Sequence, residues 1–136
     1  MIKKGTVLLL MFFVSIILVG CGGESKEEKM YNELNDISNK FKSNTISGTE
    51  LHDKAKSIYS NYCPDSDNSF CSDLDSALKE WEETKLDDCT TYADGSSEKY
   101  VCEATYASKK YLYENKDSSL NTKIIYMIMT YKRAHE

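Results

Sequence analysis

Residues 89–102 read CTTYADGSSEKYVC, and this stretch decides whether the C-terminal half of the chain is expected to form a sheet or a helix. Gly95 and Ser96 lie near its centre, and a two-residue loop with glycine first suits the type II′ turn of a hairpin. Counting outward from that loop places Cys89 opposite Cys102 in a non-hydrogen-bonded pair, where side chains approach most closely. The stretch therefore predicts a β-hairpin closed by a Cys89–Cys102 disulfide.

The residues after this loop follow a period of two, which is typical of strands. Residues 100–106 alternate between two sets of side chains and predict a half-buried strand. Residues 111–113 predict a short third strand, and residues 124–131, which are apolar on both faces, predict an inner strand or one covered by helices. A competing interpretation makes residues 97–114 a fourth helix, but the β-branched and aromatic content and the Gly-Ser turn favour strands.

The N-terminal half of the chain predicts three amphipathic helices. Apolar residues recur at spacings of 4, 3 and 4 in residues 25–43 and 47–62, and at i, i+3, i+4 and i+7 in residues 72–87. The second helix begins with Ser47 and Glu50 in a capping-box pattern. The expected fold class is therefore α+β: about three N-terminal helices packed on a C-terminal antiparallel meander of about four strands, in a single domain of residues 30–136.

The N-terminus has the three parts of an export signal. Lys3 and Lys4 are followed by an apolar run over residues 7–19, and the run ends in Leu-Val-Gly-Cys at residues 18–21. This tetrapeptide resembles the lipobox of bacterial lipoproteins. The resemblance implies that residues 1–20 are a signal peptide and that Cys21 is lipidated after cleavage. Residues 21–29 then form the lipidated cysteine and a polar tether.

The same resemblance implies a place in the cell envelope. Several acyl chains on Cys21 would anchor the protein permanently to a membrane. Gly22 is not the aspartate that retains such lipoproteins at the inner membrane of enteric bacteria. The expected location is the inner leaflet of the outer membrane in a Gram-negative host, and otherwise the outer face of the cell membrane.

The four remaining cysteines are expected to form two disulfides, because exported chains meet oxidising conditions. A helix over residues 72–87 would hold Cys71 and Cys89 about 27 Å apart, whereas a disulfide needs Cα atoms within about 7 Å. Cys63 lies near Cys71 at the same end of that helix, which leaves the pairs Cys63–Cys71 and Cys89–Cys102. A redox or metal site is the alternative, but no two cysteines have C-x-x-C spacing and no histidine is suitably near either pair.

The length, charge and composition of the chain limit the classes of partner that it is expected to bind. The chain has 136 residues, room for one domain, and its formal charge of −5 becomes −7 once Lys3 and Lys4 leave with the signal peptide. So acidic a chain has no electrostatic reason to bind nucleic acid. Leucine, isoleucine, valine and phenylalanine make up only about 14% of residues 21–136, so the ten tyrosines, the tryptophan and the disulfides are expected to supplement a thin core.

No motif for catalysis, a metal or a cofactor is present. His52 and His135 are expected on the surface, and neither has a second histidine at metal-ligand spacing. No serine lies in G-x-S-x-G, and the glycines form no phosphate loop. Residues 65–70 resemble the start of a calcium loop, but Phe70 replaces the glycine and Ser76 the bidentate glutamate. The sequence therefore supports neither an enzyme nor a bound cofactor.

Two surfaces are candidates for binding a protein. One is an acidic patch that would meet a basic partner, formed by Glu80, Trp81, Glu82 and Glu83. The other is any exposed subset of the tyrosines expected on the sheet, although most of these are expected in the core: Tyr92, Tyr100, Tyr106, Tyr111, Tyr113, Tyr126 and Tyr131. The expected function is a lipid-anchored interaction module of the inhibitor, immunity, exclusion or secretion-assembly type, with an unidentified envelope protein as partner. A periplasmic small-ligand-binding lipoprotein or, less favoured, a hydrolase is the alternative.

Overall fold

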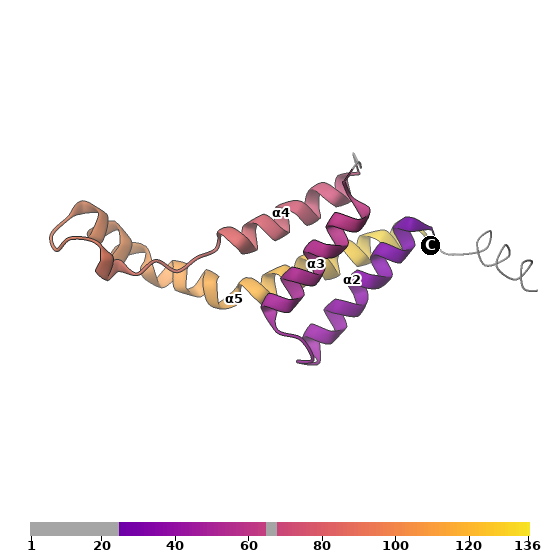
Figure 1. Ribbon diagram of the computed structural model, residues 1–136, viewed down its shortest axis with the longest axis horizontal. Coiled ribbons are helices and arrows are strands. Elements are labelled where there is room, and N and C mark those ends of the chain that lie inside the picture. The colour runs from indigo at the N-terminus through magenta and orange to yellow at the C-terminus, as the bar shows by residue number, and fades with distance from the viewer. Residues whose placement is uncertain (1–24, 65–67) are drawn as a thin grey trace, which may run out of the picture.

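The computed structural model describes residues 25–64 and 68–136, and in these residues the fold is helical throughout (Figure 1). The expected signal peptide, Cys21 and residues 65–67 of the stretch that resembles the start of a calcium loop lie outside the described residues. Residues 25–64 and 68–136 form four long helices, with a single 3₁₀ turn, η1 (Cys89–Thr91), before the last: α2 (Lys26–Lys42), α3 (Gly48–Tyr62), α4 (Ser69–Glu83) and α5 (Ser97–Ala134). The described residues contain no strand, so the predicted α+β class is wrong.

Each long helix begins where a short polar side chain caps its first turn. Ser25, Ser47 and Ser96 accept hydrogen bonds from the amide three residues on, and Asn68 accepts one from the amide two residues on, at 3.0–3.2 Å. These bonds satisfy backbone donors that a helix start leaves unpaired. The three helices expected in the N-terminal half are present, and the Ser47 cap lies where the capping-box pattern predicts it.

The predicted meander is replaced by one helix of 38 residues, α5. Gly95 adopts a positive φ of 78° in the loop before the Ser96 cap, so the Gly-Ser pair starts a helix instead of turning a hairpin. The run over residues 124–131 is apolar on both faces of a strand, but as a helix it buries Ile124, Met127 and Ile128 at spacings of 3 and 1. The competing interpretation of residues 97–114 as a helix is the correct one, and the helix continues to Ala134.

The core lies between α2, α3, α4 and the C-terminal half of α5, which form a four-helix bundle in which consecutive helices run in opposite directions (Figure 1). Each of these helices contributes one apolar stripe. Five apolar side chains of the described residues are essentially inaccessible to solvent: Leu34, Leu51, Ala55, Leu74 and Ile124. Tyr31 is the one fully buried tyrosine, and its ring stacks on that of Tyr131 at 3.6 Å. Burial, aided by the Glu27 carboxylate, raises the pKa of Tyr31 well above its ordinary value.

The N-terminal half of α5 extends beyond the bundle together with the segment that leads into it (Figure 1, orange and brown). We call residues 84–116 the stalk. At 1.5 Å per residue α5 is about 57 Å long, roughly twice the length of the helices it packs against. Within the stalk only Cys102 is buried. The stalk therefore has no hydrophobic core of its own.

Both disulfides pair as predicted, each with Cα atoms 5.7 Å apart. Cys63–Cys71 joins the end of α3 to the start of α4 inside the bundle core. Cys89–Cys102 joins η1 to the second turn of α5 and holds the connecting segment against the stalk helix. The predicted hairpin geometry around this second bridge is wrong, because α5 brings Cys102 back to Cys89 instead.

Candidate functional site

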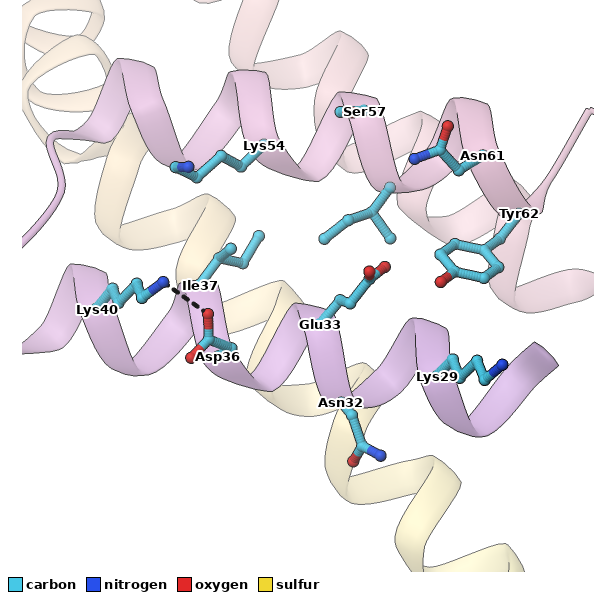
Figure 2. Close-up of a pocket in the computed structure, with 11 residues that line it drawn as sticks. Lys29, Asn32, Glu33, Asp36, Ile37, Lys40, Lys54, Ser57, Asn61 and Tyr62 are labelled. Carbon is cyan, nitrogen blue, oxygen red and sulfur yellow. Dashed lines mark ion pairs between the residues drawn. The ribbon is translucent and has the colours of Figure 1, made fainter. Parts of the chain in front are cut away.

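A surface groove of about 580 Å³ runs between α2 and α3 (Figure 2). Its floor is apolar, with Ile37 and Ile58, and its rims carry lysine, carboxylate and amide side chains. Asp36 and Lys40 form an ion pair at 2.9 Å along one rim. Desolvation, and the Glu33 carboxylate that faces it, raise the pKa of Tyr62 at one end. Charges of both signs are spread along the rims and do not converge on one point, so the groove presents no arrangement suited to hydrolysis.

Trp81 lies at the junction of the bundle and the stalk, and three other helical residues enclose it. Its ring stacks on His52 of α3 with ring centroids 4.1 Å apart, and its Nε1 donates to the Asp117 carboxylate of α5 at 2.6 Å. The Lys116 ammonium lies 4.1 Å from the indole centroid, a cation–π contact. Asp117 also fills the space beside Gly48, where any Cβ would fall 1.9 Å from its Cγ. The tryptophan therefore ties three helices together.

The acidic patch is engaged in contacts within the molecule. Glu82 bonds Lys56 at 2.6 Å and His52 Nε2 at 3.0 Å, and Glu80 pairs with Lys123. The Lys56 ammonium, and to a smaller extent His52, hold the pKa of the Glu82 carboxyl below its ordinary value. His52 is 5% exposed, so its expected surface position is wrong: α4 covers it with the Trp81 ring. His135 is exposed, as expected.

The tyrosines expected in the core of a sheet are mostly on the surface. Tyr100, Tyr111 and Tyr126 are 74%, 67% and 72% exposed, and only Tyr131 of the predicted set is half-buried against the core. The prediction that most of them are core residues is wrong for the same reason as the predicted sheet. A strand inside a covered sheet is buried on both faces. A helix that extends beyond the bundle is covered on one side only, so its other side chains are exposed to solvent.

Two of these exposed tyrosines share one face of the stalk helix with two exposed alanines. Tyr100, Ala104, Ala107 and Tyr111 follow spacings of 4, 3 and 4, which place them in one row along α5, and all four are exposed. Exposed apolar side chains border the row, among them Val101 and Leu112. We call these six residues the stalk face. The helical spacing was present in the sequence, but the same residues also fit the alternation of a strand.

Comparison with known proteins assigns no family to the chain, and the described residues show no metal site. No protein-family model, curated protein or solved structure matches it. Among the described residues no three histidine, cysteine, aspartate or glutamate side chains are grouped so as to hold a metal ion. None of the described helices is both long and apolar enough to cross a membrane.

Proposed function

We propose that the protein is a lipid-anchored cell-envelope protein that acts by contacting another protein, and that the stalk is its contacting element. The anchor rests on the lipobox-like residues 18–21 and Cys21. The helix that follows begins at Lys26, close to the C-terminal end of α5, because Tyr31 stacks on Tyr131 there. The stalk projects from the opposite end of the bundle (Figure 1). An anchor at Cys21 would thus leave the stalk directed away from the membrane.

The exposure of the stalk face carries this proposal. Four of its side chains, Tyr100, Val101, Tyr111 and Leu112, are each more than half exposed. Contiguous exposed apolar groups are uncommon on soluble proteins unless they bind something, and tyrosine is enriched at binding hot spots. The disulfide Cys89–Cys102 braces this face at its free end, so it is presented on a restrained helix.

The distribution of charge favours the stalk over the acidic patch as the surface that contacts a partner. The stalk carries lysines and acidic residues in nearly equal number, so an apolar contact there is not opposed by a large net charge. In the patch, Glu80 and Glu82 already contact lysines of neighbouring helices, which reduces the charge offered to a partner. The expected partner surface is therefore apolar and partly aromatic, and not basic.

The anchor is tested by the form of the mature protein. Wild-type protein from cells grown with a clickable palmitate analogue is expected to begin at Cys21 and to carry label, because the lipobox-like residues direct cleavage and acylation there. Cys21→Ser is expected to carry no label. Intact-mass spectrometry gives the N-terminus. An unlabelled wild-type protein that begins at another residue would remove the anchor from the proposal.

The contact is tested by capture from envelope extract with oxidised residues 22–136, which keep every described contact. Wild-type protein is expected to retain one stoichiometric envelope protein, and Tyr100→Ala with Tyr111→Ala is expected to reduce its capture at least tenfold. Tyr126→Ala is the matched control, since Tyr126 is equally exposed on the bundle half of α5. Equal capture by the stalk variant and the control would show that the stalk does not make the contact.

A further inference from the structure

The central row of the stalk face reads the same in both directions. Tyr100, Ala104, Ala107 and Tyr111 give the order large, small, small, large, with spacings of 4, 3 and 4 from either end. Spacings of this kind are the a and d positions of a two-helix seam. All four residues are exposed, so no helix of this chain occupies the seam. A row that is symmetric about its own centre suits a partner related to it by a two-fold axis.

An antiparallel second stalk would match this row layer by layer. Antiparallel helices place an a residue of one opposite a d residue of the other. Ala104 then lies opposite Ala107 of the second copy, and the small side chains let the two backbones approach closely. Tyr100 lies opposite Tyr111 of the second copy at each end, where aromatic rings pack in offset or edge-to-face contact.

The charges beside the row distinguish antiparallel from parallel pairing. Glu103 and Lys110 lie seven residues apart on the same edge of the row, and both are exposed. In an antiparallel pair this edge meets its own copy, so Glu103 lies opposite Lys110 of the second copy, and symmetry makes the pair occur twice. In a parallel pair Glu103 would instead lie opposite Ser108, which offers no opposite charge.

The position of the two-fold axis sets which residues of the two copies overlap. The two-fold axis would pass between residues 105 and 106, so residue 97 of one copy lies opposite residue 114 of the other. The first bundle-core residue of α5 after the stalk is Leu120. The stalk helices therefore overlap along their whole length, while the two bundles lie at opposite ends of the pair.

We propose that the stalk face binds a second copy of this chain, as an antiparallel two-helix seam centred between residues 105 and 106. The inference rests on the proposed function, in which the stalk is the contacting element, and names its partner. The seam is short, so the association is expected to be in the micromolar range in solution.

Charge reversal tests both the seam and its direction, with oxidised residues 22–136 in sedimentation velocity at low salt. Glu103→Lys and Lys110→Glu are each expected to weaken the dimer about tenfold, because each turns two opposite-charge pairs into like-charge pairs. The double variant is expected to restore wild-type association. Ala107→Glu, with a charge inside the row, is expected to abolish the dimer. Lys54→Glu, an exposed reversal on α3 away from the stalk, is the matched control, and circular dichroism checks the fold of each variant.

The outcomes separate this inference from the proposed function. A wild-type protein that stays monomeric at 0.5 mM, or a double variant no better than either single reversal, would overturn the antiparallel seam. If the monomeric protein still captured an envelope protein through Tyr100 and Tyr111, the stalk would remain the contacting element with a different partner. Loss of both the dimer and the capture would overturn both.

Discussion

Trp81→Ala is expected to lower the free energy of unfolding by about 3 kcal/mol, the largest effect of any single substitution outside the fully apolar core. The indole packs between helices, and its removal takes away the stacking on His52 and the hydrogen bond to Asp117. It also leaves the Asp117 carboxylate without its indole donor at the junction where α5 leaves the bundle. The cation–π contact from Lys116 is lost with the ring.

Urea unfolding followed by far-ultraviolet circular dichroism measures this change, since the variant lacks the only tryptophan of the chain. Trp81→Phe keeps a ring against His52 but has no N–H for Asp117, so it is expected to lose less, about 1–2 kcal/mol. Glu83→Ala, two residues on and exposed, is the control and is expected to change stability by less than about 0.5 kcal/mol. If the free energy of unfolding of Trp81→Ala lay within 1 kcal/mol of the wild-type value, the contacts of Trp81 would not be what joins the three helices.

The two disulfides are expected to differ sharply in their effect on stability, although both close short loops, with sequence separations of 8 and 13. Replacing Cys63 and Cys71 by alanine is expected to lower global stability by about 3 kcal/mol. Their side chains are buried in the bundle core, and the bridge closes the connection between α3 and α4. Removing it both frees the unfolded chain and loosens a packed contact.

Replacing Cys89 and Cys102 by alanine is expected to leave the bundle almost as stable as before but to release the stalk. The connecting segment is otherwise held by few contacts, among them the 2.9 Å ion pair between Asp87 and Lys109. Hydrogen exchange measured by mass spectrometry is expected to rise across residues 85–104 while protection of the bundle helices stays the same. Equal loss of protection in bundle and stalk would show that the two fold as one cooperative unit.

Local patterns were sufficient to predict α2, α3 and α4. Leu34, Leu51 and Leu74 lie on stripes with a period of 3.6, and Ser47 caps the second helix as its sequence predicts. In α5 the same reasoning failed, because Tyr100 and Tyr106 fit both a strand and the sides of an isolated helix. The strand interpretation also assumed that aromatic residues are buried, and in the stalk that assumption does not hold.

The candidate site likewise combines features that the sequence predicted with contacts that it did not. The pairing of Cys89 with Cys102 was predicted from chain geometry, but the helix that brings them together was not. Trp81 was singled out for its acidic neighbours, whereas its contacts with His52 and Asp117 join residues 29 and 36 positions away in the chain. No pattern in a single sequence specifies such a contact, because it depends on how the helices pack.

The helical periodicity of α2, α3 and α4, the Ser47 cap, the two disulfide pairs and the resemblance of residues 18–21 to a lipobox could all be recognised from the sequence. Each of these follows from spacing or from groups a few residues apart. The packing of the helices was needed to show that α5 is one helix, that its C-terminal half completes the bundle and that its N-terminal half extends into solvent. The physical reason is that α2, α3 and α4 are too short to cover a helix of 38 residues. The uncovered half keeps its tyrosines on the surface.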